Sequence, residues 1–195
     1  IVACGTSLNA GHVAKHWLER HAKIPCRVEI ASEHRYRHHT IEENTLFLAL
    51  SQSGETADTL AALRQAKHNG YCVTLAICNV PESSIVRETD LVFLTQAGNE
   101  IGVAATKTFT AQLVALASLS IGLCQLKKRP DELIFKHIQA LQKLPQEINS
   151  LLAIESTIQE LATQFIQKHH TLFLGRGKQY AIAREAALKL KEISY

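Results

Sequence analysis

The chain has 195 residues, of which 46% are hydrophobic and 20% charged, and its net charge is +3. This composition is typical of a folded globular protein, and the length favours one domain or one domain and part of another. No apolar run approaches the roughly 18 residues that a membrane span needs, so we expect neither a membrane segment nor a signal peptide. Lys and Arg are scattered, with one cluster at 127–129, which argues against nucleic acid as a partner.

The five cysteines indicate reduced, buried thiols. They are Cys4, Cys26, Cys72, Cys78 and Cys124. Their number is odd, most lie in apolar segments, and none forms a Cys-x-x-Cys pair. We therefore expect a cytoplasmic protein without a disulfide framework or a zinc site.

Both ends of the sequence lie inside regular patterns. The chain begins within a strand pattern at 1–4, contains no methionine, and reaches Tyr195 within a helical pattern that has no cap or breaker. Because helices normally end at such signals, we expect a fragment of a longer polypeptide.

The most informative stretch is 45–56, Thr-Leu-Phe-Leu-Ala-Leu-Ser-Gln-Ser-Gly-Glu-Thr. It predicts a buried strand, a polar turn and the start of a helix. The start of a helix presents unpaired N–H groups and the positive end of the helix dipole, which suit a phosphate. Ser and Thr also cap many helices, so the residues alone favour capping and phosphate binding equally.

Strand and helix patterns alternate along the first two thirds of the chain. The predicted strands are 1–4, 26–31, 46–50, 72–77 and 91–94, and a long apolar helix over 106–126 is expected to be largely buried. This alternation predicts an α/β fold, a parallel sheet flanked by helices. The common strand order is 2-1-3-4-5, with ligands bound where strands 1 and 3 diverge. The turns at 4–7 and 51–56 would then share one crevice.

A second unit is expected near the end of the chain. Two helical patterns, interrupted at Pro145, cover 131–168, and 171–195 then repeats the order strand, glycine turn, helix with which the chain opens. Such self-similarity suits an internal repeat. We predict a first domain at 1–128, connecting helices at 129–168, and the beginning of a truncated second domain at 169–195.

Several common site types are disfavoured. The Gly-x-Gly at 175–177 is not completed to a dinucleotide fingerprint, and neither polar turn has the Lys of a P-loop. The pairs His12/His16 and His34/His38 have helical spacing but no evident carboxylate partner. We therefore expect these histidines to be solvated rather than to bind metal.

Two charged positions have open alternatives. Lys189 and Glu192 are three residues apart on a helical pattern, so their side chains can meet. They form either an exposed ion pair or a general base with a tuning ammonium. Lys107 is either a ligand contact or a surface lysine, and we favour the surface.

Five motifs, taken together, resemble one family. They are Cys4-Gly5-Thr6-Ser7, the stretch 50–59, the stretch 99–104 with Thr106-Lys107, the stretch 174–177, and 187–195, Ala-Leu-Lys-Leu-Lys-Glu-Ile-Ser-Tyr. In this order, and over essentially the whole chain, they resemble the isomerase half of the glucosamine-6-phosphate synthases, the glutamine:fructose-6-phosphate aminotransferases. The resemblance implies two sugar isomerase (SIS) domains, each a five-stranded parallel sheet flanked by helices.

The resemblance also implies a set of site residues. Glu192 would move the proton between C1 and C2 of the sugar, with Lys189 beside it. The substrate-binding set would be Ser51, Gln52, Ser53 and Thr56 at the phosphate, Cys4, Gly5, Thr6 and Ser7 close by, and the Val103 backbone at the sugar hydroxyls. Ala105 departs from the serine expected in the family, which puts one contact near the sugar in doubt.

The implied activity is the conversion of fructose 6-phosphate and glutamine to glucosamine 6-phosphate and glutamate, the first step of hexosamine and UDP-N-acetylglucosamine synthesis. The implied ligand is fructose 6-phosphate or glucose 6-phosphate. The implied partners are a second copy in a homodimer and a covalently linked glutaminase domain, with no metal or organic cofactor. A ring-opening histidine and a Schiff-base lysine would lie beyond Tyr195. We therefore expect no synthase activity and little isomerase activity from this chain alone.

Two other functions would share part of this motif set. A non-catalytic phosphosugar-sensing SIS module would share the serine-rich turn but would not need Lys189 and Glu192. A stand-alone isomerase with one SIS domain would not need the repeat that starts near position 171. The retained pair and the repeat favour the synthase family.

Overall fold

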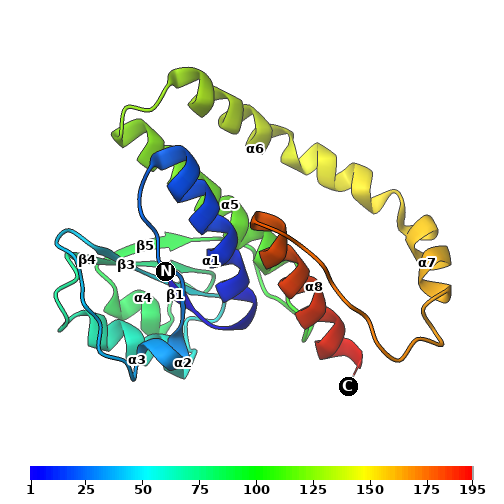
Figure 1. Cartoon of the computed structure of the whole chain (residues 1–195), viewed down its shortest axis with the longest axis horizontal. Helices are drawn as coiled ribbons and strands as arrows, with labels where there is room; N and C mark the ends of the chain where they lie inside the picture. The colour runs from blue at the N-terminus through cyan, green and yellow to red at the C-terminus, as the bar shows by residue number, and fades with distance from the viewer. Residues whose placement is uncertain (195) are drawn as a thin grey trace.

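The structure is a computed structural model that describes residues 1–194; Tyr195, the last residue of the expected final helix, lies outside the described residues. Short strands and helices alternate as far as α5 (Figure 1). The elements are β1 (Val2–Ala3), α1 (Gly5–Trp17), the π-helix η1 (Leu18–Ala22), β2 (Glu29–Ile30), α2 (Ala31–His34), β3 (Leu46–Ser51), α3 (Ala57–Ala66), β4 (Val73–Cys78), α4 (Ser84–Glu88), β5 (Leu91–Leu94), α5 (Lys107–Leu126), α6 (Asp131–Leu152), α7 (Glu155–Thr163) and α8 (Lys178–Ser194).

The five strands form one parallel sheet in the order β2-β1-β3-β4-β5, which confirms the predicted α/β fold and strand order. Its centre is the pair β3 and β4, in register from Leu46 opposite Val73 to Ser51 opposite Cys78. Both strands are buried over most of their length. Continuous apolar runs of this kind are typical of parallel strands covered on both faces.

Successive side chains of β3 enter two different cores, because side chains alternate across a strand. Leu48 and Leu50 pack in the cluster formed with α1 and α5. Phe47 and Ala49 pack in the cluster formed with α3 and Ile85 of α4. The sheet is therefore the middle of three layers. The polar turn that follows β3 begins at the carboxyl end of this strand, between the two helical layers.

One predicted strand is shorter than expected, and two other predicted features of secondary structure were wrong. The strand predicted at 26–31 is reduced to β2, because β1 offers it only two residues for pairing and α2 begins at Ala31. Pro145 does not interrupt a helix but lies inside α6. The helix is mostly exposed there, so water can satisfy the carbonyl that lacks an N–H partner. The segment 171–174 has no strand beside it among the described residues and is not itself a strand.

The long apolar helix α5 is less buried than predicted. Its buried residues form one stripe with helical spacing, namely Thr108, Gln112, Ala115, Leu116, Ser120 and Cys124. The stripe faces α1 and η1, while the other faces stay partly exposed. By length and composition, α5 is also the one helix of the described chain that could cross a membrane, contrary to the expectation of no such run.

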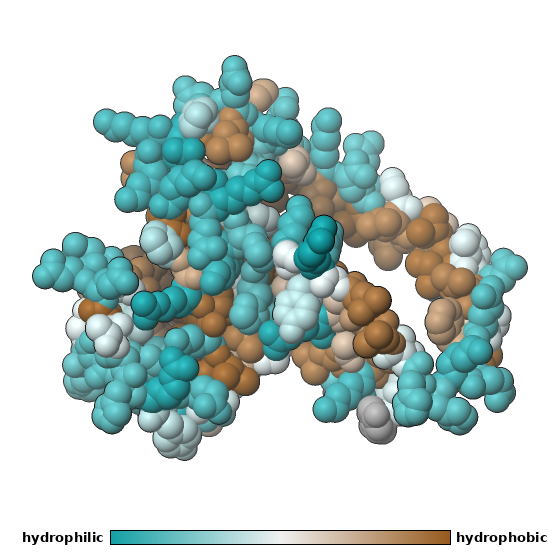
Figure 2. All heavy atoms as spheres, viewed as in Figure 1, coloured by the Kyte–Doolittle hydropathy of each residue, from teal (hydrophilic) through white to brown (hydrophobic). Residues whose placement is uncertain are grey.

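Helices α6 and α7 extend away from the sheet, and α8 returns to pack against α1 (Figure 1). Many large apolar side chains of α6, α7 and the segment that follows α7 are exposed. They are Phe135, Leu151, Leu152, Ile154, Ile158, Leu161, Phe165, Ile166, Leu172 and Leu174. Figure 2 shows an apolar surface along α6 and α7. A contiguous apolar surface of this kind is typical of a contact region.

Candidate functional site

The two polar turns singled out in the sequence leave the same edge of the sheet. Strands β1 and β3 are parallel neighbours, with Val2 opposite Ala49, so their carboxyl ends point the same way. The turn 4–7 follows β1 and the turn 51–56 follows β3. In parallel α/β sheets ligands bind outside the carboxyl ends where neighbouring connections diverge, so this edge is the candidate site.

Hydroxyl groups of the second turn hold its own backbone in shape. Ser51 Oγ accepts a hydrogen bond from the Gly54 N–H at 3.0 Å and lies 3.5 Å from Thr56 Oγ1. Ser53 Oγ accepts one from the Glu55 N–H at 3.2 Å. Thr56 is the N-cap residue of α3, yet its side chain makes no cap hydrogen bond. The start of α3 therefore keeps N–H groups available for an anion in front of the turn.

Gly54 allows the turn to pack closely against the end of β4. Its φ is +68°, a left-handed conformation that side chains disfavour, and a Cβ at this position would lie 2.0 Å from Ser83 Oγ. The Gly54 carbonyl accepts a hydrogen bond from the Ile85 N–H at 3.1 Å. Glycine is thus required here both for backbone conformation and for space.

Glu55 has a structural role next to the turn. Its carboxylate accepts hydrogen bonds from the Ser84 N–H at 2.7 Å and from the Ser84 hydroxyl at 2.8 Å. These bonds stabilise the ionised form and lower the pKa of Glu55. The side chain is committed to the start of α4, so it is not available to a ligand.

The first turn is fixed by two helices that come from later in the chain. Ser7 Oγ accepts a hydrogen bond from Gln112 Nε2 of α5 at 2.9 Å. Thr6 Oγ1 donates to Glu185 Oε1 of α8 at 2.9 Å. Cys4 is the N-cap residue of α1 and Gly5 has a φ of +52°. The turn is therefore held by its hydroxyls, while Gly5 faces open space.

Glu185 joins this turn to the predicted catalytic pair. It is buried at 5% exposure, and besides Thr6 it accepts a hydrogen bond from Asn9 Nδ2 at 2.8 Å. Lys189 Nζ lies 3.6 Å from Glu185 Oε1 and 2.5 Å from Glu192 Oε2. Neither Glu185 nor Asn9 was among the site residues predicted from the sequence. The available signal was the four-residue helical spacing between Glu185 and Lys189.

Lys189 lies between a buried carboxylate and a partly exposed one. The side chains of Lys189 and Glu192 are 21% and 30% exposed, so solvent and small molecules reach them. A carboxylate in this position can accept a proton from carbon and return it, and the ammonium beside it can stabilise negative charge that develops on a substrate oxygen. The pair has the contact that the spacing predicted.

Val103 stands apart from the other predicted site residues. It is 93% exposed in the connection between β5 and α5, and no described hydrogen bond joins 101–103 to either turn. Lys107 is exposed, as predicted. Ala105 lies partly exposed in the same connection. The structure therefore places the two turns at one edge of the sheet, joins the first turn to Lys189 through Glu185, and leaves Val103 at the tip of a loop.

One group of donors among the described residues has the composition of a metal site. It consists of Glu29, His34 and His39, whose ligand atoms lie within 4.8 Å of one another. His34 Nδ1 is 2.9 Å from Glu29 Oε2, and the two imidazole rings stack 3.9 Å apart. The nitrogen lone pairs of an imidazole lie in the plane of its ring. Because the two stacked rings are nearly parallel, their lone pairs do not converge on one ion as those of zinc ligands do. The expectation that His34 is solvated was wrong, because it is buried beside Phe47.

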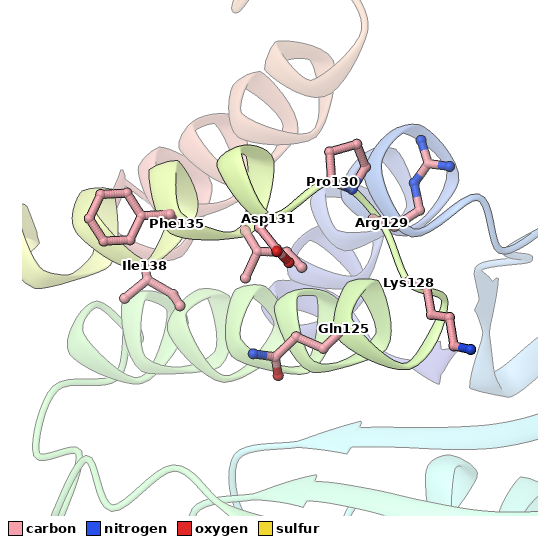
Figure 3. Close-up of a pocket in the computed structure, with 8 residues that line it drawn as sticks. Gln125, Lys128, Arg129, Pro130, Asp131, Phe135 and Ile138 are labelled. Atoms are coloured by element: carbon pink, nitrogen blue, oxygen red, sulfur yellow. The ribbon is translucent and has the colours of Figure 1, made fainter.

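A separate cavity of about 500 Å³ lies where α5 connects to α6 (Figure 3). Its lining residues are Gln125, Lys128, Arg129, Pro130, Asp131, Ile134, Phe135 and Ile138. Both charge signs occur at this site, and no lining residue belongs to either polar turn or to α8. The cavity is therefore distinct from the candidate site.

Comparisons with known proteins agree with the fold. The family model described as SIS domain matches residues 1–121. The chain is 58% identical to a glutamine–fructose-6-phosphate aminotransferase (isomerizing) of Pseudomonas syringae pv. tomato and 56% identical to that of Pseudomonas aeruginosa. Each match covers 100% of this chain and 32% of the relative, so the chain spans about a third of the length of these proteins.

Solved structures share the fold. The C-terminal domain of glucosamine-fructose-6-phosphate aminotransferase from Francisella tularensis matches with a TM-score of 0.97 and 52% identity, over 100% of this chain and 55% of that chain. A glucosamine-6-phosphate deaminase from Thermotoga maritima matches with a TM-score of 0.71 and 23% identity, over 96% of this chain and 55% of that chain. At that identity the second likeness concerns the fold alone.

Proposed function

Because this chain belongs to the SIS domain family, we propose that it binds a phosphosugar and contributes ketose–aldose isomerisation to a glutamine:fructose-6-phosphate aminotransferase. The substrate would be fructose 6-phosphate, and the product of the whole protein glucosamine 6-phosphate. The observation that carries the proposal is the path of polar contacts from Thr6 through Glu185 and Lys189 to Glu192. It links a turn at the sheet edge to a proton-accepting carboxylate.

The phosphate is proposed to bind the turn 51–56, hereafter the phosphate turn. Its hydroxyls and the N–H groups at the start of α3 suit an anion, and the helix dipole favours negative charge there. Ser51, Gln52, Ser53 and Thr56 would contact the phosphate, and Cys4, Gly5, Thr6 and Ser7 would border it. No resident metal is needed for this type of recognition.

Glu192 is the proposed base. Isomerisation removes a proton from carbon next to a carbonyl or imine and returns it one carbon away, which one carboxylate can do by accepting and then donating it. Lys189, held by both Glu185 and Glu192, would stabilise the negative charge on the adjacent oxygen during the transfer. A non-catalytic sensor would need neither side chain, so the paired charges favour the enzyme.

We also propose partners for the exposed surfaces. The apolar arm of α6 and α7 suits contact with the remainder of a second SIS domain, of which 169–195 would be the beginning, and a glutaminase domain would be linked in the same polypeptide. A homodimer is the proposed assembly. The five cysteines are free, which suits a cytoplasmic location.

The test is calorimetric titration of the chain with fructose 6-phosphate. Thr56→Val keeps the shape of the side chain and removes its hydroxyl, and we expect affinity to fall by about tenfold. Thr40→Val, in an exposed segment, is the control and should bind as the unchanged chain does. Equal binding by the Thr56 variant, or no binding by the unchanged chain, would contradict the proposal. Synthase activity from this chain alone would contradict the proposal that it supplies only the isomerisation part of a larger enzyme.

A further inference from the structure

Asn79 joins the phosphate turn to the loop that carries Val103, two segments that come from different parts of the chain. It follows β4 directly, and its backbone N–H donates to the Gln52 carbonyl of the phosphate turn at 3.3 Å. Its side-chain Oδ1 accepts hydrogen bonds from Thr95 Oγ1 at 3.0 Å and from the Ala97 N–H at 2.8 Å. Its Nδ2 donates to the Gly98 carbonyl at 2.8 Å. One residue is thus bonded to the phosphate turn and to the start of the connection 95–106, here called the sugar loop.

The part of the sugar loop that Asn79 binds has an unusual backbone. Gln96 has a φ of +53° and Gly98 a φ of +68°. A left-handed conformation is costly for a residue with a side chain and persists where the surroundings hold it. Asn79 bonds to the residues on both sides of Gln96, so its side chain supplies this support.

The far end of the sugar loop is fastened separately, to its own helix. Glu100 Oε2 accepts hydrogen bonds from the Thr106 N–H at 3.3 Å, the Thr108 N–H at 3.1 Å and the Thr108 hydroxyl at 2.8 Å. Between the two anchors, Ile101 and Val103 are 95% and 93% exposed. Among the described residues, Asn79 has the one side chain outside the loop and α5 that hydrogen-bonds to the loop.

We infer that Asn79 is a positioning residue, which sets the distance between the phosphate turn and the sugar loop and so determines recognition of the sugar. The inference rests on the proposed function. The resemblance assigns the sugar hydroxyls to the Val103 backbone, so a phosphosugar whose phosphate binds the phosphate turn would span both segments. Inorganic phosphate contacts only the turn. Loss of the Asn79 side chain therefore weakens binding of the phosphosugar and leaves binding of inorganic phosphate unchanged.

The experiment compares two probes, fructose 6-phosphate and inorganic phosphate, by calorimetric titration of the full 195-residue chain. For Asn79→Ala we expect affinity for fructose 6-phosphate to fall by about tenfold, with affinity for inorganic phosphate unchanged within about twofold. Thr95→Val removes one of the three side-chain bonds without adding charge, so its loss should be smaller and in the same direction. Asn69→Ala is the matched control, because Asn69 is exposed and its side chain makes no hydrogen bond among the described residues.

Hydrogen exchange of single amides provides a readout that needs no ligand. The Ala97 amide, which donates to Asn79 Oδ1, should exchange faster in Asn79→Ala, while the Gly54 amide, bonded to Ser51 Oγ, should not change. Faster exchange at both amides would show a general loosening and would overturn the specific role of Asn79 in the sugar loop.

The outcomes separate this inference from the proposed function. Equal weakening of both probes in Asn79→Ala, or no weakening of fructose 6-phosphate binding, would overturn the inference alone. Failure of the unchanged chain to bind either probe would overturn the proposed function, and with it the role of Asn79 in sugar recognition. Selective loss of fructose 6-phosphate binding supports both.

Discussion

Thr6 and Glu185 are 179 positions apart, and they are joined by a hydrogen bond of 2.9 Å. The bond ties the first turn of α1 to α8, the helix that carries the proposed catalytic pair. Because Glu185 also accepts from Asn9 and lies near Lys189, one buried carboxylate sets where α8 sits on α1. The proposed base is thus placed by a residue that has no part in the chemistry itself.

Glu185→Ala should therefore destabilise the protein and loosen α8. The change leaves the buried amide of Asn9 without its acceptor, and such a loss typically costs about 2 kcal/mol. Urea unfolding gives the free energy, and hydrogen exchange reports whether the α8 amides lose protection before those of β3. Glu160→Ala, on the exposed face of α7, is the control. Unchanged protection of α8 would show that its apolar contacts with α1 suffice.

Gly54 and Gly70 offer a matched pair of substitutions. Both have positive φ, but a Cβ on Gly54 would collide with Ser83 Oγ, whereas one on Gly70 would meet nothing within 4 Å. Gly70→Ala should cost about 1 kcal/mol from backbone conformation, and Gly54→Ala about 1–3 kcal/mol more because Ser83 must move. Thermal unfolding measures both, and equal melting temperatures would contradict the packing argument.

The sequence predicted the central layer well because the information is local. The apolar runs of β3 and β4 and the polar turn at 51–56 each carry their own signal, and the topology rule for parallel sheets placed two turns together. Burial of α5 was overestimated because a helix that is apolar on every side does not reveal which side has a neighbour. Glu185 was missed because its contact with Thr6 depends on the tertiary fold.

The burial of His34 also depends on the tertiary fold, and it leads to a prediction of pH dependence. Burial lowers the pKa of His34, against the opposing hydrogen bond with Glu29. Burial also lowers the pKa values of His12 and His21. The unfolded chain then binds protons more readily than the folded protein as pH falls below the ordinary histidine pKa of about 6.5. Stability should therefore decrease from pH 7.5 to pH 5.5.

The His34 contribution can be isolated by substitution. His34→Phe keeps a flat ring beside Phe47 and cannot be protonated, so its free energy of unfolding should fall less between pH 7.5 and pH 5.5. His16→Phe, at an exposed position of α1, is the control for loss of a histidine. Urea unfolding at the two pH values provides the comparison. If the free energy of unfolding changed equally with pH in both variants, His34 would not be the cause of the pH dependence.

The proposed chemistry is tested in a full-length protein that contains this segment. Glu192→Gln keeps the size and hydrogen-bonding reach of the side chain but removes its ability to accept a proton from carbon. Turnover of fructose 6-phosphate should fall by at least about 100-fold, the usual contribution of a general base. The dissociation constant of fructose 6-phosphate should change little, because the phosphate turn is intact.

Lys191→Gln, one residue before Glu192 and exposed on the same helix, is the matched control and should keep near-normal turnover. Lys189→Met tests the second member of the pair. It removes the cation held between Glu185 and Glu192, so turnover should fall while phosphosugar binding persists. If Glu192→Gln weakened binding and turnover in equal proportion, the side chain would act in ground-state recognition, and a non-catalytic phosphosugar-binding role for this site would explain the structure better.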